Sequence, residues 1–459
     1  MFRLEGTGHS RAWRVGVAAV ATGSVLLATA CSSSKKSSSA SSASAATSAA
    51  AATPVTLNMV VQPFAYKNFS AVVSKYKTVQ PNVTINLTQG GASSAEYIQG
   101  LTTARLGGHV PDIFETFDVI SDQMAASGLT EDLTPWLAKG GGFDRSGFAD
   151  AFLASYIPRK AQNELHGLPV AADATVVFYN KRIFKDAGVA LPTDDWSYDT
   201  FLADAQAISK AGNGAYWGVS LQNDGSVPPS IWQAQYQPMI KAYGGYVYDA
   251  MTNTVGIGHP EAVKAWEQLL APLKNGGAPP YGTSAGATAP TFAAGKYGMQ
   301  ISVRAQMPSY MEPLKADGWD VVQMPIVNGK HVVGGGSYGM AMAKDGKNKD
   351  AVWNFIKWFY SNDGGIKLLE DTYATVPPTK VGIASGSWKT LPAPPANVNA
   401  FGAAISDAVI APALPGKSGA ALDAAVLKAV QQVALNNRPV ADAFAEAEAS
   451  VNEALKAEK

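Results

Sequence analysis

The chain has 459 residues, and its 36 basic side chains balance its 36 acidic ones. This balance provides no basic field for a nucleic acid, and the single cysteine, Cys31, excludes an internal disulfide and a thiolate metal site. The length allows two ordinary domains, and the 43 aromatic residues (10 Trp, 17 Tyr and 16 Phe) suffice for a core and a stacking surface.

The chain begins with a leader of the secretory type. Three arginines precede an apolar run at residues 15–30 that is too short and too rich in alanine and glycine to suit a membrane span. We therefore expect residues 1–30 to be a signal peptide. The segment that ends at Cys31 resembles the bacterial lipobox, in which the cysteine receives a lipid. Alanine stands three residues before Cys31, where leucine is usual, so ordinary cleavage and free secretion remain the alternative.

Residues 31–53 are expected to form a disordered, lipid-anchored tether. After Cys31 they are almost wholly serine, alanine and lysine, which cannot bury enough apolar surface to offset the entropy of ordering. Two or more acyl chains hold a protein stably at a membrane, so we expect the following domains at the outer face of the cytoplasmic membrane. Removing the leader's three arginines and one glutamate leaves 33 basic and 35 acidic residues, a formal charge of −2.

The segment after the tether reads as alternating strands and helices. Residues 55–61 form an apolar strand, and Phe69 and Tyr76 lie on the apolar face of a helix that stops before Pro81. Residues 83–87 alternate apolar and polar side chains, which predicts a second strand. This strand-helix-strand order is typical of an α/β layered domain.

The next elements lead to the first candidate binding edge. A helix is expected over residues 97–104, followed by a strand from residue 111 that ends near Phe117 and Asp118. Ligands of open α/β sheets bind beyond the C-terminal ends of the strands, so these two residues are placed at a candidate site.

Later segments continue the same pattern. Strands are expected at residues 174–179, 217–220 and 340–343, and helices after Asn180, from Pro260, near Asp350 and at the C-terminus from Val440. Trp266 lies on a helical apolar stripe and Trp353 beside one, so both are predicted to be core residues.

Four stretches together resemble one protein family. They are residues 107–113 (Gly-Gly-His-Val-Pro-Asp-Ile), 167–170 with 178–181, 292–299 (Phe-Ala-Ala-Gly-Lys-Tyr-Gly-Met), and 334–337 followed by the helix near Asp350. In this order and spacing the chain resembles the carbohydrate-binding lipoproteins of bacterial ABC importers, the family that includes maltodextrin-binding protein.

The resemblance implies an α/β, two-lobed fold of the periplasmic-binding-protein type. Each lobe is a sheet flanked by helices, and crossover hinge strands join the lobes. The implied crossovers lie near residues 171–175, 327–334 and 379–385. Lobe one is then expected to comprise residues 54–171 plus 333–382, and lobe two residues 172–332 plus 383–459.

The implied ligand, a sugar, needs a particular kind of site. It presents flat CH faces and paired hydroxyl groups, so aromatic surfaces must stand beside planar hydrogen-bonding groups. Gln62 and Phe64 follow the first strand, where relatives place such a pair. Phe117 and Asp118 are expected to face the cleft, with core packing of Phe117 and helix capping by Asp118 as the alternatives.

Three further residues are assigned by resemblance. Asp173 stands on the first crossover, where maltodextrin-binding protein has a ligand-contacting carboxylate; capping of local amides is the alternative. Trp232 stands in a proline-rich loop where relatives present a stacking aromatic, and core packing is its alternative. Arg304 replaces a stacking tryptophan, which disfavours maltodextrin and predicts a guanidinium that grips hydroxyls or a carboxylate, or else a surface or lobe-bridging ion pair.

The sequence Gly-Gly-Ser-Tyr-Gly at residues 335–339 fits the nucleophile elbow of α/β-hydrolases. All five histidines precede Ser337, whereas that fold needs its histidine after the nucleophile. The following residues also predict a strand where an elbow requires a helix. We therefore interpret the glycines as a close backbone approach at the cleft, where Gly335 and Ser337 offer hydrogen bonds to ligand.

These observations predict a binding protein that closes two lobes around a sugar or oligosaccharide and delivers it to ABC permease subunits. No enzyme activity, cofactor or metal is expected, and the protein is expected to be a monomer. A tethered glycoside hydrolase is the alternative from another class, because Asp112, Glu115, Asp118 and Asp173 include enough carboxylates for a catalytic pair. A polyol or a glycerophosphodiester is the alternative ligand.

Overall fold

The computed structural model describes residues 53–91, 93–140, 144–221, 233–282, 290–372, 376–390 and 393–458. These ranges belong to one contact-connected unit, Ala52–Lys459. The predicted signal peptide, Cys31, nearly all of the tether and Trp232 lie outside the described residues.

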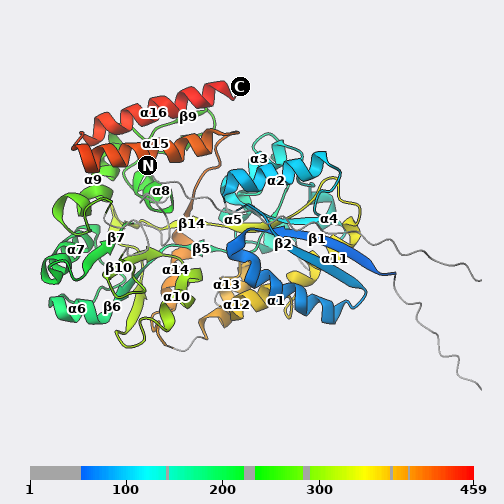
Figure 1. Ribbon diagram of the computed structural model, residues 1–459, viewed down its shortest axis with the longest axis horizontal. Coiled ribbons are helices and arrows are strands. Elements are labelled where there is room, and N and C mark those ends of the chain that lie inside the picture. Colours follow the sequence, from blue (N-terminus) through cyan, green and yellow to red (C-terminus); the bar gives the residue numbers. More distant parts are fainter. Residues whose placement is uncertain are drawn as a thin grey trace, which may run out of the picture. The chain divides into compact units, whose positions relative to one another are not determined.

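Lobe one is built around a five-stranded sheet of order β2-β1-β3-β15-β4. Its strands are β1 (Val55–Val61), β2 (Val83–Gln89), β3 (Ile113–Phe117), β15 (Tyr338–Met342) and β4 (Leu168–Pro169). Strands β1 and β2 of this sheet are labelled in Figure 1. β1 is parallel to β2 and β3, whereas β15 is antiparallel to its neighbours β3 and β4. The predicted strands at residues 55–61, 83–87 and 340–343 are confirmed with small shifts of their ends.

Helices cover both faces of this sheet. They are α1 (Pro63–Val79), α2 (Ser94–Leu106), α3 (Asp118–Ala126), α4 (Thr134–Ala138), α5 (Asp150–Ala154), α11 (Lys349–Phe359) and α12 (Gly365–Asp371), with the 3-10 turn η1 (Arg145–Gly147). Apolar residues of α1, α11 and α12 form one buried cluster with β1, and those of α2 and α3 form a second with β3 and β15. This burial accounts for the helical spacing of Phe69 and Tyr76.

Lobe two is built around a four-stranded sheet of order β11-β6-β10-β7. Its strands are β6 (Val176–Asn180), β7 (Trp217–Ser220), β10 (Tyr297–Ser302) and β11 (Trp319–Val322). β10 is parallel to β7 and antiparallel to β6. A Cβ on Gly218 would lie 1.9 Å from the carbonyl oxygen of Ala205, so only glycine allows β7 this close to its covering helix.

Eight helices of lobe two lie within the described ranges. They are α6 (Lys181–Ala187), α7 (Tyr198–Gly212), α8 (Gln233–Ala242), α9 (Pro260–Asn275), α10 (Met307–Met311), α14 (Asn399–Asp407), α15 (Ser418–Asn436) and α16 (Val440–Ala457). The short hairpin of β8 (Tyr248–Asp249) and β9 (Thr254–Val255) packs on α16. The ring of Trp266 stacks on that of Phe444 at 4.1 Å, so the prediction that Trp266 is a core residue is confirmed, and so is that for the buried Trp353.

A small three-stranded sheet joins the two lobes. β14 (Gly334–Gly336) pairs with β5 (Asp173–Ala174) in antiparallel and with β16 (Val409–Ile410) in parallel orientation. The hairpin of β12 (Ile326–Val327) and β13 (Lys330–His331) leads into β14. The fold is therefore α/β and two-lobed, as predicted.

The third predicted crossover strand is wrong in its secondary structure. Residues 380–385 form the helix α13 (Lys380–Ser385), and the turn η3 (Ser387–Lys389) follows it. The Thr379 hydroxyl caps this helix by accepting the N–H of Gly382, and Gly386 ends it with a φ of 67°. The capping residue itself pairs with another segment, through an isolated antiparallel bridge between Thr379 and Phe148.

Among the helices within the described ranges, none combines the length and the apolar character that crossing a bilayer requires.

Candidate functional site

Aromatic side chains gather where strands of lobe one end. The ring centroid of Phe64, just inside α1, lies 6.1 Å from that of Phe117 and 6.0 Å from that of Tyr338. Phe64 is 60% exposed, an unusual state for a phenylalanine beside two other rings. Phe64, Phe117 and Tyr338 thus form an accessible aromatic surface, of which the sequence predicted two members.

Asp118 connects the end of β3 with the start of β15. It is the first residue of α3, and its carboxylate accepts the N–H of Val119 at 2.8 Å and that of Ser337 at 3.0 Å. A Cβ on Gly336 would lie 3.3 Å from the same carboxylate. Burial raises the pKa of Asp118 to about 6, although both N–H groups favour the ionised form.

Asp173 lies on β5, in the sheet that joins the lobes. Its Oδ1 atom is buried and has no hydrogen-bond partner among the described residues. Burial raises the pKa of Asp173 to about 7; Arg304 acts to lower this pKa, and Asp118 raises it further. Two of the predicted acidic residues are thus close enough to influence each other's charge.

Glu115 is a third carboxyl group in this region. It is 0% exposed on β3, and its Oε2 accepts the backbone N–H of Gln62 at 2.8 Å. Its Oε1 has no hydrogen-bond partner within the described ranges. Burial raises the pKa of Glu115 to about 8. Gln62 therefore contributes a backbone N–H here, and its side chain is also buried.

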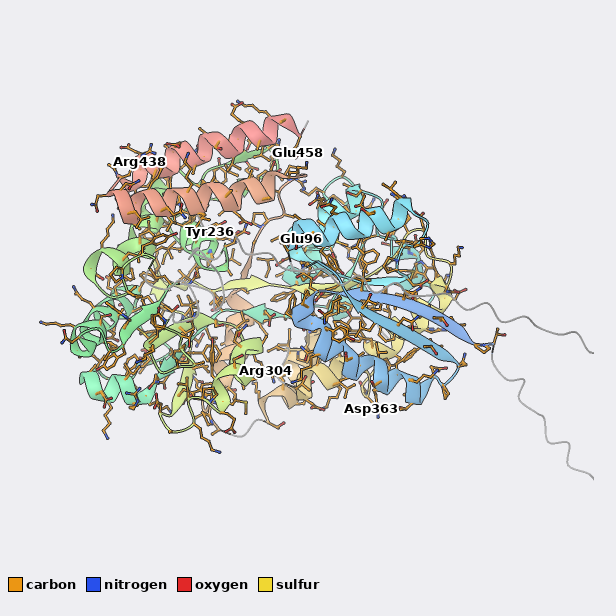
Figure 2. The ribbon with its side chains drawn as sticks, in the orientation of Figure 1. Glu96, Tyr236, Arg304, Asp363, Arg438 and Glu458 are labelled. Atoms are coloured by element: carbon orange, nitrogen blue, oxygen red, sulfur yellow. The ribbon has the colours of Figure 1, made fainter. Side chains whose placement is uncertain are left out.

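Arg304, labelled in Figure 2, begins the 3-10 turn η2 (Arg304–Gln306). This turn lies against β5. Only 1% of the surface of Arg304 is exposed. Its Nη2 donates to the carbonyl oxygen of Trp388 at 3.2 Å and to that of Glu370, in α12 of lobe one, at 3.4 Å. The guanidinium thus bridges segments of both lobes, which is close to the alternative weighed from the sequence.

Ser337 uses its hydroxyl inside the protein. Its Oγ donates to the carbonyl of Ala171 and accepts from the hydroxyl of Tyr156, both at 2.9 Å. A Cβ on Gly335 would lie 2.6 Å from a side-chain carbon of Ile410, so the close backbone approach expected of these glycines is present. The strand β15 follows Ser337, where a nucleophile elbow would need a helix.

A pocket of about 280 Å³ lies beside Asp118. It is lined by α3, α5 and the segment after α5 on the side of lobe one, and by β8, Ile410 of β16, and Ala411 and Pro412 just after β16. Arg159 and Tyr248 are the long polar side chains of its wall. Neither residue was predicted from the sequence, and Arg159, in a Pro-Arg-Lys loop, has the pattern of an ordinary surface charge.

Comparison with known proteins gives three kinds of similarity. Residues 65–366 match the family model described as bacterial extracellular solute-binding protein. A putative binding protein of Brucella abortus (strain 2308) is 25% identical over 279 residues, which cover 60% of this chain and 65% of that relative's length. The maltotriose-binding protein of Pyrococcus abyssi is 24% identical over 374 residues, or 78% of this chain and 73% of that protein.

Among solved structures, the fold is similar to that of an ABC substrate-binding protein of Listeria monocytogenes in complex with cycloalternan. The TM-score is 0.75 at 21% identity, and the match covers 88% of this chain and 99% of that one. This likeness supports the two-lobed fold described above. The match to the family model covers well over half of the sequence, and the chain therefore belongs to the bacterial extracellular solute-binding protein family.

Proposed function

We propose that this protein is the extracytoplasmic binding component of an ABC importer, and that it captures a sugar or oligosaccharide between its lobes. The observation that carries this proposal is the juxtaposition of the exposed aromatic surface at Phe64 with the carboxyl groups of Asp118 and Asp173. Aromatic rings stack on the CH faces of a sugar, and carboxylates accept hydrogen bonds from its hydroxyls. The names of the Pyrococcus and Listeria relatives are consistent with this ligand class.

Asp173 has the strongest case for direct contact with the ligand. Its buried Oδ1 lacks a partner among the described residues, and leaving a buried acceptor unsatisfied costs about 1–3 kcal/mol. A ligand hydroxyl donated to this atom removes that cost. Because β5 belongs to the sheet that joins the lobes, a ligand held there contacts the region about which the lobes turn.

Closure of the lobes then provides the signal to the permease. Ligand contacts from both lobes exist together only in the closed form, so the ligand shifts the population toward that form. We further propose that Cys31 carries a lipid and that residues 31–53 tether a monomeric body to the outer face of the membrane. The family's extracellular location supports this proposal.

A thermal-shift screen tests the ligand class. The panel contains monosaccharides, linear and cyclic oligosaccharides, polyols and glycerophosphodiesters. A ligand at a hundred times its Kd stabilises the native state by about 2.7 kcal/mol and is expected to raise the Tm by a few degrees. A response confined to polyols or glycerophosphodiesters contradicts the sugar assignment, and release of reducing ends from the responding sugar contradicts a binding role.

A further inference from the structure

Arg159 reaches from lobe one to lobe two at the wall of the pocket. Its Nη1 donates a hydrogen bond of 2.8 Å to the hydroxyl of Tyr248, on β8 of lobe two. Both side chains line the pocket, together with Asp118. The bond therefore spans the two lobes at the edge of the space next to a predicted ligand-binding residue, and separation of the lobes there must break it.

Lobe one holds the arginine in a fixed orientation. The carboxylate of Asp122, on α3, accepts the backbone N–H of Arg159 at 2.8 Å, its Nε at 3.1 Å and its Nη2 at 2.7 Å. The planar guanidinium is thereby fixed along one edge, and Nη1 is the nitrogen that projects to the other lobe. The side chain is 28% exposed, so water can replace the contact with Tyr248 when it breaks.

Contacts within lobe two likewise fix the orientation of the Tyr248 hydroxyl. The hydroxyl of Tyr248 donates to the Asn253 side chain at 2.8 Å, within the β8–β9 hairpin. Asn452, on α16, holds that hairpin by accepting the N–H of Val255 at 2.8 Å and donating to its carbonyl at 3.2 Å. Both partners are oriented before they meet, so little conformational entropy opposes the contact.

We propose that Arg159 and Tyr248 form a latch that stabilises the approach of the lobes before any ligand is bound. A hydrogen bond to a charged group is stronger than one between neutral groups, and partial exposure weakens it, so its loss is expected to lower the ratio of closed to open lobes about tenfold, and the closed population by the same factor where that form is the minor one. A smaller competent population lowers the apparent affinity in proportion. This consequence for affinity rests on the proposed function, whereas the latch itself does not.

The latch is tested on the full chain without ligand. Cys31→Ser removes the native thiol, and Gln99→Cys on α2 and Leu435→Cys on α15, both exposed positions, carry spin labels. Pulsed electron paramagnetic resonance then measures the distance between the lobes. Tyr248→Phe is expected to shift the distance distribution toward longer values, because it removes one hydroxyl and keeps the ring.

Tyr246→Phe is the matched control. Tyr246 is also half-buried, and its hydroxyl makes no hydrogen bond to the rest of the described chain, so the control is expected to leave the distribution unchanged. An unchanged or shorter distance for Tyr248→Phe overturns the latch.

A second measurement separates the latch from the proposed function. For any sugar that raises the Tm, Tyr248→Phe is expected to lower the affinity about tenfold. If that affinity falls while the ligand-free distance stays unchanged, Tyr248 contacts the ligand directly and the latch is overturned. If no sugar binds, the proposed function fails, and the ligand-free distances still decide the latch.

Discussion

Arg304 and Arg159 both bridge the two lobes, but they do so in different surroundings. Arg304 is 1% exposed and donates to backbone carbonyls beside the joining sheet, whereas the side chain of Arg159 is 28% exposed and donates to a tyrosine at the pocket wall. A buried guanidinium that loses its partners cannot be solvated by water instead, whereas a partly exposed one can. The contacts of Arg304 are therefore part of the buried packing, whereas the contact of Arg159 lies where water can replace it.

The largest effect is expected from removing the buried bridge. Arg304→Met leaves the carbonyls of Glu370 and Trp388 without this donor and should lower the free energy of unfolding by about 3 kcal/mol. Urea denaturation of the unliganded protein measures this change. A loss below about 1 kcal/mol would mean that the buried Arg304 contributes no more to stability than an exposed side chain, which contradicts the difference drawn between the two arginines.

Glu115 is a second buried ionisable side chain with which Arg304 can be compared. It is as buried as Arg304, but it accepts a hydrogen bond from a backbone N–H. Its pKa of about 8 exceeds the value of about 4.3 in an unfolded chain, so between these values the native state holds more protons. The free energy of unfolding must therefore fall as pH rises through this window, by about 2 kcal/mol between pH 6 and 8.

Replacing Glu115 by glutamine is expected to reduce that dependence, leaving the part that Asp118 and Asp173 contribute through their own raised pKa values, and to stabilise the protein at pH 8. Urea denaturation at several pH values is the measurement. Asp363→Asn, at an exposed position of lobe one (Figure 2), is the control and should keep the slope of the parent. If the free energy of unfolding of the Glu115 variant depends on pH as in the parent, Glu115 is not the group that causes the dependence.

Asp173 lies close enough to the buried Arg304 for that guanidinium to act on its pKa, and it is the residue proposed to contact the ligand. Its pKa of about 7 means that about a tenth of the carboxyl is ionised at pH 6 and about nine tenths at pH 8. If the ionised form accepts ligand hydroxyls, affinity should rise about tenfold over this range. Isothermal titration calorimetry with a ligand from the thermal-shift screen measures it. Asp173→Asn should bind more weakly and without this pH dependence, and an unaltered pH profile would exclude Asp173 from the site.

The smallest effect on stability is expected at the half-exposed bridge. Arg159→Met should lower the free energy of unfolding by about 1 kcal/mol, because water can solvate Asp122 and Tyr248 once the guanidinium is gone. The same urea titration used for Arg304→Met gives the value. Equal losses for the two arginines would remove the distinction drawn between them.

Local sequence patterns predicted much of the fold. The alternation of residues 83–87 and the helical spacing of Phe69 and Tyr76 correspond to elements that bury one face in a layered sheet. The prediction of a crossover strand at residues 379–385 was wrong because it came from the family resemblance and did not consider the Thr379 cap, which favours a helix. The local cap therefore accounts for the helical structure of this segment.

The site was less accessible to prediction. Phe117 ends β3, and Phe64 and Asp118 follow the ends of β1 and β3, so the topology of the sheet brings them together. Arg159 and Tyr248 are 89 positions apart and meet only through the packing of two lobes. The burial of Glu115 depends on β3 being an interior strand covered on both faces, which the sequence of β3 alone does not reveal.

The composition of β14 has a consequence for building optical reporters from this protein. Three successive glycines form the strand, and a methyl group on Gly334 would lie 1.7 Å from the carbonyl oxygen of Ala234. A dye or a fluorescent domain attached at β14 would therefore collide with the neighbouring backbone and distort the strand. The turn of the β8–β9 hairpin, where Met251 is 96% exposed, offers an attachment point that leaves this crowded strand intact.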